Sequence, residues 1–381
     1  MLRKILWACV IILLCALTGM LVFLNIGTDE PQLASEPVQT AETEPTEPEP
    51  TEAPTEAVTE APTEAPTEPP EPVEYTLSFA GDCCLGNKKG WSPSTYFMGT
   101  VGDNYEYPFA NVQEYFANDD CTFVNLEVVF TDSDAAANKT FVFKGPTSYT
   151  QILTAGNVEF ANVVNNHTRD YGQQGYDDTI AALDEAGLLY AEEEEYIIFT
   201  TESGLTLGVY ADQFPENMGG LEETIAAMRE DGAEIVIVCL HWGVEYYYQA
   251  NAGQQSLGHA AIDAGADIVY GHHPHVLQRV EEYNDGYIYY SLGNFSFGGH
   301  TNPPDKDTAI LQQTVIREPD GTVHLGELTM IPCSLSSVST TNDFQPTPLE
   351  EGTDAYERVL SKLEGTYNKV RLQVDYRPDL G

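Results

Sequence analysis

Basic residues are scarce in this sequence. Its 381 residues include 16 Lys and Arg against 60 Asp and Glu, which gives a formal net charge of −44. A protein that binds nucleic acid needs a basic surface for the phosphates, and this composition offers none. The composition therefore excludes nucleic acid as a partner. The same negative field repels any long polyanion unless cations bridge the two.

Cysteine is also sparse and irregularly spaced. The seven Cys are an odd number without a repeating interval, so they do not indicate a disulfide framework. Cys121 and Cys239 lie in apolar runs typical of strands, which predicts small buried side chains. The adjacent Cys83 and Cys84 follow Asp82 directly, and the pattern leaves their role open.

Residues 28–74 lack bases and almost all large apolar side chains. The segment holds 14 acidic residues, and the unit Thr-Glu-Ala-Pro begins at positions 51, 59 and 63. Such a segment cannot bury a core and is expected to stay extended, as Pro-rich and self-repelling linkers do. We predict a disordered stalk that lifts the following domain off a membrane, as would suit a thick-walled bacterium.

An apolar stretch distinguishes residues 1–27. Arg3 and Lys4 precede 22 predominantly apolar residues, 5–26. About 20 apolar residues span a bilayer as a helix, whereas the apolar part of a cleaved signal peptide has about 7–15. Because no base follows until Lys88, the positive-inside rule places the N-terminus in the cytoplasm and the rest outside. The segment is therefore predicted to be an uncleaved, single-pass signal anchor in the cell membrane.

Residues 75–381 are predicted to form one α/β domain with mixed sheets. Apolar runs typical of buried strands alternate with helical patterns, several of which end at a Gly. The predicted strands are 75–80, 122–124, 161–164, 235–240, 267–270 and a final one at 369–375. The predicted helices are 108–116, 146–155, 175–186, 221–231, 254–264 and 355–363. Turn residues at 284–286 and 319–321 predict two hairpins, 280–290 and 309–332.

Polar side chains follow most of these strands. Such residues at the ends of neighbouring strands converge on one rim of a sheet, where a metal or a substrate can reach several at once. The motifs are Gly81-Asp82, Asn125-Leu126-Glu127, Asn165-Asn166-His167, His241-Trp242-Gly243-Val244-Glu245, Gly271-His272-His273-Pro274-His275 and Ser291-Leu292-Gly293-Asn294-Phe295. Together they predict a functional site.

Imidazoles are the strongest ligand candidates. His273 and His275 lie at i and i+2 after a buried strand, so in an extended segment they point to the same side and suit a divalent metal. His272 makes a third His in four positions, but only part of such a cluster can face one ion. His241 follows another strand and completes the set. Glu127 would bury its carboxylate at a strand end unless something neutralises it, and a metal would.

Other polar residues suggest acid–base and binding roles. The amide oxygen of Asn166 is a hard ligand, and the neighbouring His167 is a candidate proton donor. Glu245 lies four residues after His241 and could serve the same chemistry. Lys144 is one of few bases in an acidic domain, so it either binds an anion or is simply solvated.

These motifs closely resemble the CapA family of capsule or poly-γ-glutamate synthesis proteins, within the calcineurin-like metallophosphoesterase superfamily. The resemblance runs from about residue 75 to the end and includes both the order and the spacing of the motifs. It implies a four-layer α/β/β/α sandwich with a metal site at the strand ends. The motifs that carry it are those given above, together with Phe143-Lys144-Gly145-Pro146, Asp170-Tyr171-Gly172 and Asn342-Asp343-Phe344-Gln345-Pro346.

The resemblance also implies roles for individual residues. The implied metal ligands are Asp82, Glu127 as the bridging carboxylate, Asn166, His241, His273 and His275, with His167 as the proton donor. They would hold one or two divalent ions, with Mn, Zn, Fe and Mg not distinguished. Two departures stand out. Cys84 occupies the usual place of a His, and Asn125-Leu126-Glu127 replaces the usual Gly-Asp. One metal position then lacks a ligand unless Cys84 or Glu245 serves.

Three functions fit this reading. The first is an extracytoplasmic metal-dependent hydrolase or transferase acting on a phosphoester or a γ-glutamyl amide. The second is a non-catalytic accessory that holds poly-γ-glutamate through cations beside other capsule-synthesis membrane proteins. The third is a cell-wall binding module. Outside residues 28–74 and the two N-terminal bases, 46 acids face 14 bases, a balance of −32. Unassisted binding of a polyanion by this domain is therefore unfavourable.

Overall fold

The computed structural model describes residues 71–373. The predicted anchor, residues 1–27, lies outside the described residues, as does the predicted stalk up to residue 70. Within the described range, no helix has the length and apolar character that crossing a membrane requires. The first element is β1 (Val73–Cys84), so the last two residues assigned to the stalk already belong to a sheet.

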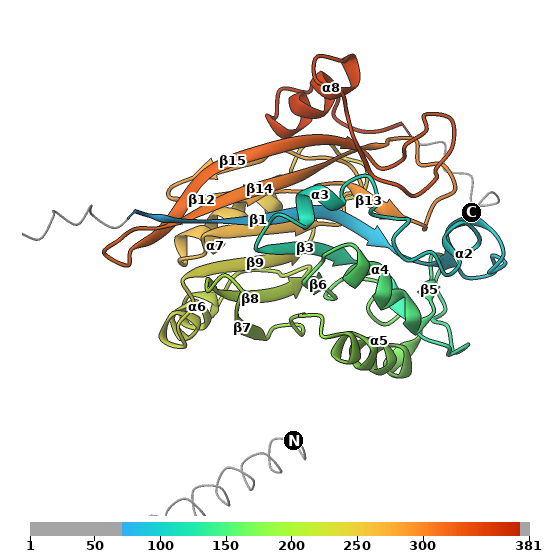
Figure 1. Ribbon diagram of the computed structural model, residues 1–381, viewed down its shortest axis with the longest axis horizontal. Coiled ribbons are helices and arrows are strands. Elements are labelled where there is room, and N and C mark those ends of the chain that lie inside the picture. The colour runs from blue at the N-terminus through green and yellow to red at the C-terminus, as the bar shows by residue number, and fades with distance from the viewer. Residues whose placement is uncertain (1–70, 374–381) are drawn as a thin grey trace, which may run out of the picture. The chain divides into compact units, whose positions relative to one another are not determined.

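The first sheet is built around β1. Its strand order is β16-β15-β14-β1-β3-β6, and β13 pairs with the end of β1 (Figure 1). β1 runs parallel to β3 and antiparallel to β14, so the sheet is mixed, as predicted. The other strands are β3 (Cys121–Leu126), β6 (Phe160–Asn162), β13 (Asn294–Phe297), β14 (Asp307–Arg317), β15 (Val323–Ser334) and β16 (Thr347–Pro348).

The second sheet has the order β11-β12-β10-β9-β8-β7. Its central strands β8, β9, β10 and β12 are parallel, and β7 and β11 close the two edges in antiparallel pairs. Its strands are β7 (Tyr196–Thr200), β8 (Thr206–Gln213), β9 (Ile235–His241), β10 (Ile268–His272), β11 (Val280–Tyr283) and β12 (Gly286–Tyr289). A small third sheet contains β2 (Asn87–Lys88), β4 (Val129–Phe130) and β5 (Phe143–Gly145).

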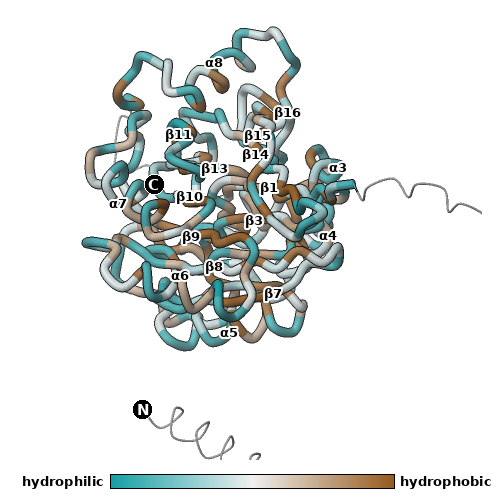
Figure 2. The backbone as a smooth tube through the Cα atoms, turned by 90° about the vertical axis from the view of Figure 1, so that its left-hand side faces the viewer, coloured by the Kyte–Doolittle hydropathy of each residue, from teal (hydrophilic) through white to brown (hydrophobic). Residues whose placement is uncertain are grey.

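The two large sheets pack face to face and helices cover their outer faces. The side chains of β9 alternate accordingly: Ile235 and Ile237 belong to the core between the sheets, and Val236 and Val238 belong to the core beneath the helices. In Figure 2 the hydrophobic segments concentrate along the central strands. These layers confirm the predicted α/β/β/α sandwich.

All of the described helices except α8 contribute to the cores on the two outer faces. α3, α4 and α5 contribute to the core on the first sheet, and α6 and α7 to the core on the second. α8 packs against β14 and β15, at the top of Figure 1, and inserts Val359 and Leu363 into the core between the sheets. The helices are α2 (Tyr96–Val101), α3 (Gln113–Phe116), α4 (Thr150–Ala155), α5 (Gly172–Ala186), α6 (Leu221–Glu230), α7 (Ala252–Asp263) and α8 (Asp354–Leu363), with a 3-10 turn η1 (Thr147–Tyr149).

Most of the predicted elements are present, but short elements such as α2, β13, β16 and the strands of the third sheet were not predicted, and three other differences stand out. The predicted helix 108–116 forms only at its end, as α3. The hairpin of β7 and β8 was not predicted. The predicted final strand 369–375 is wrong over its described part, where Arg371 makes only an isolated bridge to Tyr247. The segment instead pairs irregularly with the loop after β9, where the Tyr248 amide donates to the carbonyl of Val370 and the Leu372 amide donates to that of Tyr246.

Candidate metal centre

The candidate site lies where the carboxyl ends of strands from both sheets meet. In the first sheet, Asp82 is the register partner of Asn125 across β1 and β3, and Glu127 follows β3 directly. In the second sheet, His241 is the register partner of His272 across β9 and β10. Each of these strands carries a polar residue at or just beside its carboxyl end, so the packing of the two sheets brings these groups to one edge.

A close backbone approach places Asp82 in this arrangement. The Asp82 amide donates to the carbonyl of Gly293 at 2.8 Å. A Cβ atom on the preceding Gly81 would lie 2.1 Å from that same carbonyl oxygen, so only glycine fits there. The contact also brings Asn294, the first residue of β13, beside the end of β1, where it is the register partner of Asp82.

Five of the six predicted metal ligands, with Glu245, form three interlocking groups. Within each group, one ligand atom per residue lies within 4.8 Å of every other. The sixth predicted ligand, Asn166, places its Oδ1 atom 3.1 Å from Nε2 of His241. The groups are Glu127 with His241 and His273, Glu245 with His273 and His275, and Asp82 with Glu127 and His275.

The buried polar atoms of this cluster fit a cation. Both carboxylate oxygens of Glu127 and Oδ2 of Asp82 are buried without a hydrogen-bond partner among the described residues. Nδ1 of His241 and Nδ1 of His273 are likewise buried without a hydrogen-bond partner among the described residues. A buried polar atom without a partner is costly, and a divalent ion bound by these oxygen and nitrogen atoms would remove that cost. The donor set therefore suits a divalent metal.

The carboxylate of Glu127 lies at the centre of the cluster. Its Oε1 atom is 3.7 Å from Nε2 of His167, 3.7 Å from Nε2 of His275 and 4.0 Å from Nε2 of His241. Burial raises the pKa of Glu127 well above its ordinary value. A nearby positive charge is needed to keep this carboxylate ionised, and a divalent cation would supply it.

Asp82 is held by contacts from several directions. Its Oδ1 accepts a hydrogen bond from Nδ2 of Asn125 at 2.9 Å and lies 3.3 Å from Nδ1 of His272. Its Oδ2 lies 3.2 Å from Nδ1 of His275. Burial alone would raise the pKa of Asp82, but the imidazoles of His272 and His275 beside it hold that pKa well below its ordinary value. Asp82 is thus an ionised, fixed carboxylate.

The imidazoles differ in protonation. Burial lowers the pKa of His241 well below its ordinary value and that of His273 to about 3, so both rings are neutral and can act as ligands. Burial also opposes a charge on His275, but Glu127 and Asp82 raise its pKa to about 10. The two carboxylates thus draw positive charge to the position of His275.

His167 lies at the edge of this cluster with a partner of its own. Its Nδ1 atom is 2.8 Å from Oδ2 of Asp170, which also accepts from the amide of Phe143 at 2.6 Å. Lys139 lies 2.5 Å from the other oxygen of Asp170. With Nδ1 held by Asp170, the Nε2 atom of His167 faces Glu127. Burial lowers the pKa of His167, which favours the neutral ring.

Three further residues were considered for the site from the sequence, and only one of them lies in the cluster. Glu245 joins the cluster beside His273 and His275. Lys144 does not, because its Nζ atom donates to the carbonyl of Ser133 and to Asp134. Cys84 is fully buried in the apolar core, belongs to none of the ligand groups, and burial raises the pKa of its thiol well above the ordinary value. Of the two proposed substitutes for the missing His, the geometry favours Glu245.

The loop after β10 corrects the predicted reason for pairing His273 with His275. The segment is not extended: φ is 96° at His273 and 55° at His275. Both values lie in the left-handed region, which is strained for residues other than glycine and is found at functional sites. The two rings reach the cluster through a tight turn around Pro274 rather than through strand alternation.

The structure adds residues to which the sequence assigned no role. They are Asn125 and His272 against Asp82, Asn294 with its Oδ1 3.0 Å from His275, Asp170 and Lys139 beside His167, and Phe214 against the rings of His241 and His273. The signal available in the sequence was membership of the same motifs, since all but Lys139 and Phe214 belong to them.

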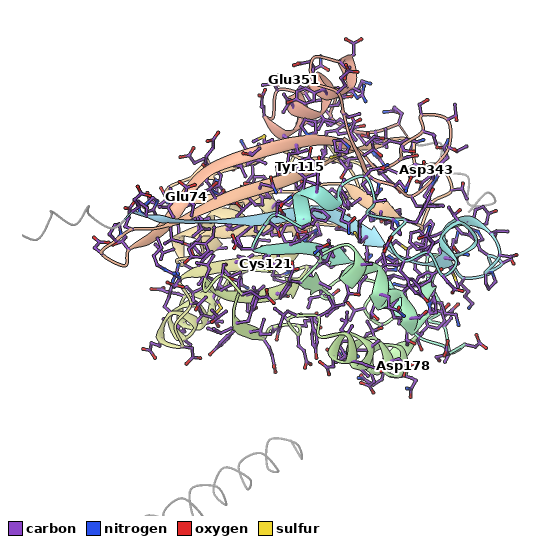
Figure 3. The ribbon with its side chains drawn as sticks, in the orientation of Figure 1. Glu74, Tyr115, Cys121, Asp178, Asp343 and Glu351 are labelled. Carbon is purple, nitrogen blue, oxygen red and sulfur yellow. The ribbon has the colours of Figure 1, made fainter. Side chains whose placement is uncertain are left out.

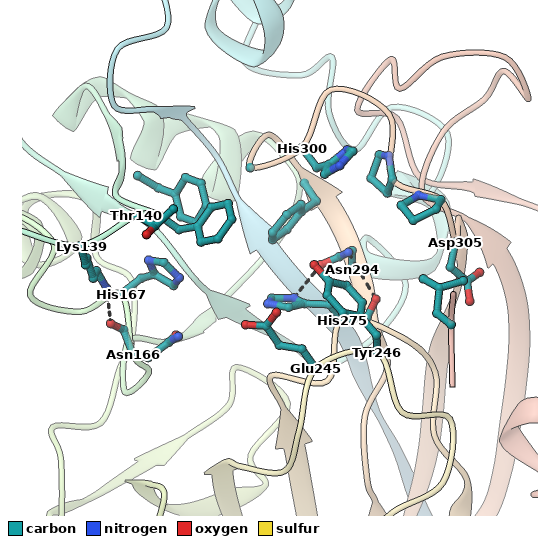
Figure 4. Close-up of a pocket in the computed structure, with 17 residues that line it drawn as sticks. Lys139, Thr140, Asn166, His167, Glu245, Tyr246, His275, Asn294, His300 and Asp305 are labelled. Atoms are coloured by element: carbon teal, nitrogen blue, oxygen red, sulfur yellow. Dashed lines mark hydrogen bonds between the residues drawn. The ribbon is translucent and has the colours of Figure 1, made fainter. Parts of the chain in front are cut away.

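A pocket opens beside the cluster, called here the site pocket. Its volume is about 210 Å³. Figure 4 shows His167 and Lys139 on one side and His275 with Asn294 across from them. Its walls also include the aromatic rings of Phe141, Phe143 and Phe297 and the side chains of Tyr246 and His300. A ligand in this pocket would touch His167, Glu245 and His275 together.

Two packed mixed sheets whose strand ends gather carboxylates and imidazoles define an α/β protein with a candidate divalent-metal centre. A family model described as "Bacterial capsule synthesis protein PGA_cap" matches residues 76–213 and 200–299. The chain therefore belongs to this family. The matched residues include all of the predicted ligands.

Two named relatives support this family assignment. The chain is 32% identical over 273 residues to "Capsule biosynthesis protein CapA" of Bacillus anthracis, an alignment that covers 64% of each chain. It is 29% identical over 287 residues to "PGA biosynthesis protein CapA" of Bacillus subtilis, covering 63% of this chain and 74% of that one. The chain thus spans less than two thirds of the length of the first relative. These likenesses confirm the predicted resemblance to CapA.

One solved structure shares a general likeness. NAD nucleotidase (NadN) of Haemophilus influenzae aligns over 77% of this chain and 56% of that chain, with 11% identity and a TM-score of 0.39. The fold assignment here rests on the layers of this chain itself.

Proposed function

We propose that this chain is a membrane-anchored, extracytoplasmic protein of poly-γ-glutamate capsule synthesis or export. Residues 1–27 would anchor it, residues 28–74 would act as a spacer, and residues 75–381 would carry the function. The names of the Bacillus relatives, which contain "capsule biosynthesis" and "PGA biosynthesis", support the pathway. Other membrane proteins of capsule synthesis and the polymer itself would be its partners.

The proposed activity is that of a metal-dependent hydrolase or transferase. The observation that carries it is the cluster of buried, unpartnered oxygen and nitrogen atoms within 4.8 Å of one another. One or two divalent ions, of Mn, Zn, Fe or Mg, would be held by Asp82, Glu127, Asn166, His241, His273 and His275, with Glu245 as a further donor. A bound divalent ion would act as a Lewis acid and lower the pKa of water.

The chain's own residues would divide the remaining work. His167 would donate the Nε2 proton to the leaving group from its doubly protonated form, because Asp170 accepts from Nδ1–H and stabilises the charged ring against burial. Lys139, 2.5 Å from Asp170, would balance the charge of that carboxylate. The rings of Phe143 and Phe297 would limit the access of water to the reacting groups. A phosphoester or a γ-glutamyl amide would be the bond attacked.

The test combines metal content with turnover. Full-length protein in detergent is analysed for metals and assayed with a generic phosphodiester and a γ-glutamyl amide, before and after chelation. We expect bound metal and a turnover that chelation abolishes. His273→Ala should lose both, whereas His324→Ala, at an exposed position outside the cluster, should keep both. A wild-type chain that binds no divalent metal would refute the proposal.

A non-catalytic accessory role is the second candidate. The observation that favours it is Cys84, which is buried in the apolar core where the superfamily resemblance leads one to expect a ligating His. One metal position would then hold its ion weakly. Bound metal without turnover on either substrate would support this role and contradict the catalytic one.

A further inference from the structure

A second cavity borders the site pocket. It has a volume of about 610 Å³, within the range typical of ligand sites, and is bounded by the start of β14, the end of β15, α8 and the segment after α8. Pro303, Pro304, Asp305 and Leu372 line both cavities. In Figure 4, Asp305 lies across the site pocket from His167. An extended ligand could therefore occupy both cavities.

This second cavity, called here the basic pocket, reverses the charge balance of its surroundings. Four basic side chains line it against two acidic ones, although the domain as a whole has 46 acids and 14 bases. The bases are Lys306, Arg358, Lys362 and Lys369, and the acids are Asp305 and Asp307. The pocket thus has an excess of two positive charges in a domain whose balance is −32.

The two acids are neutralised from the interior. Lys362 is buried and lies 2.6 Å from Asp305 and 2.7 Å from Asp307. Arg358 donates to both oxygens of Asp307 at 2.7 Å. The side chains of the two acids are only 8% and 5% exposed, whereas that of Arg358 is 44% exposed. Positive charge is therefore what the pocket presents to a ligand.

Two of the bases also retain free donors. Lys369 is exposed, its Nζ atom lies 5.9 Å from the ring centre of Tyr367, and it forms no ion pair with any described residue. Arg358 uses Nε and Nη2 on Asp307, which leaves its Nη1 group without a partner among the described residues. Lys306 donates to three backbone carbonyls, so it contributes charge rather than free donors.

We propose that the basic pocket binds the carboxylates of an acidic polyamide of the γ-glutamate type and feeds the adjoining part of that chain into the site pocket. The choice of polymer rests on the proposed function. Because Asp307 holds Nε and Nη2 of Arg358 in place, the Nη1 group is fixed and would donate a charge-assisted hydrogen bond to a polymer carboxylate. The pocket gives a strongly acidic domain a local place to hold a polyanion without relying on bridging cations alone.

The test measures binding of a fluorescently labelled γ-glutamate oligomer to the full-length chain by anisotropy. A chelator is present throughout, so that the candidate metal centre does not contribute. Lys369→Glu should weaken binding about fivefold at low salt, since one attractive exposed charge becomes repulsive. Ser339→Asp, at an exposed position on the same rim, should weaken it similarly. The matched control is Lys89→Glu, which makes the same charge change at an exposed position lining neither pocket and should bind like the wild type.

The outcomes separate this proposal from the catalytic one. Equal binding by the Lys369 and Lys89 variants would overturn it, as would binding that appears only when divalent metal is restored. A poly(glycerol phosphate) oligomer of matched charge that binds as tightly as the γ-glutamate oligomer would overturn the choice of polymer. The wild-type chain could lack metal and turnover and still bind the oligomer in the presence of chelator, in a way that depends on Lys369. That result would support the basic pocket and refute the catalytic proposal.

Discussion

Asp82 illustrates how single side chains prepare the candidate centre. A buried carboxylate usually takes up a proton, yet His272 and His275 keep this one ionised. Asn125 fixes its orientation and is itself fixed, because its Oδ1 atom accepts from Nδ2 of Asn162 at 3.0 Å and of Asn165 at 3.3 Å. This chain of amides links the ends of β1, β3 and β6 behind the site.

Removing the central amide of that chain should destabilise the protein. Asn125→Ala removes the amide donor to Asp82 and the acceptor that Asn162 and Asn165 share, so we expect a loss of about 1–3 kcal/mol in the free energy of unfolding. Urea unfolding of the variant and the wild type measures it. Asn118→Ala, at an exposed amide that caps α3, should lose far less, and an equal loss in both would count against the role of the chain.

The pair of His167 and Asp170 allows a sharper test of the proposed chemistry. Asp170→Asn keeps the shape of the side chain but weakens its hold on Nδ1 of His167, so we expect turnover to fall about 100-fold. Metal content should stay unchanged, because Asp170 belongs to none of the ligand groups. The pH–rate profile should also move. If the variant lost both its metal and its activity, Asp170 would have a structural role in the site instead.

At the level of elements, the strand ends could be predicted because they depend on local pattern. The apolar runs before Asp82, His241 and His272 are almost entirely buried in the structure, and such runs signal strands on their own. Both predicted hairpins formed because their Gly-containing turns specify them locally. Because these strands pair in parallel, their carboxyl ends meet at one edge of the sheet, and the polar residues at those ends come together.

Other features could not be predicted because they depend on tertiary contacts. The role of His272 follows from the 3.3 Å distance to Asp82 in the other sheet, which no local pattern encodes. Lys144 seemed free in the sequence, and only the fold shows that the loop before β5 supplies Ser133 and Asp134 as its partners. The left-handed turn at His273 likewise depends on its surroundings rather than on propensity.

The start of β3 offers a pH-dependent test of an element. Asp119 lies two residues before Cys121, the first residue of β3, which is labelled in Figure 3. It accepts a hydrogen bond from Thr122, and burial, followed by the charges of Glu159 and Asp120, raises its pKa to about 7. The folded state therefore binds this proton more tightly than the unfolded state, whose carboxyl has the ordinary value of 3.8. The protonated Asp119 carboxyl therefore contributes to the free energy of unfolding at low pH, and this contribution is lost as the pH rises from about 4 to about 7.

Replacing the Asp119 carboxylate by an amide should remove this loss of stability at high pH. Asp119→Asn keeps an acceptor for Thr122 but cannot ionise, so at pH 8 it should be more stable than the wild type by about 1–3 kcal/mol. Near pH 4 the two should be similar. Urea unfolding between pH 4 and pH 8 measures the difference, and Asp285→Asn in an exposed turn is the control. A gain that does not depend on pH would contradict the assignment.

At the scale of the whole molecule, charge is distributed unevenly. Acids outnumber bases by 32 from residue 75 onward, yet four of the 14 bases line the basic pocket. Most of the acids lie on exposed surface, where they repel one another across the domain. The described chain thus combines a repulsive exterior with one attractive cavity beside its candidate metal centre.

That repulsion should make stability depend on salt. Raising sodium chloride from about 0.01 M to about 0.15 M shortens the screening length from about 30 Å to about 8 Å, so we expect the Tm to rise by about 2–5 °C at pH 7. Ion pairs such as Arg229 with Asp267 weaken under the same change and oppose the rise, but they are few beside the excess of acids. Calorimetry at a lower pH, closer to the pI of about 4.1, should show a smaller rise because fewer carboxylates are ionised. A Tm that falls with salt at pH 7 would mean that ion pairs, rather than net charge, dominate the electrostatics of this domain.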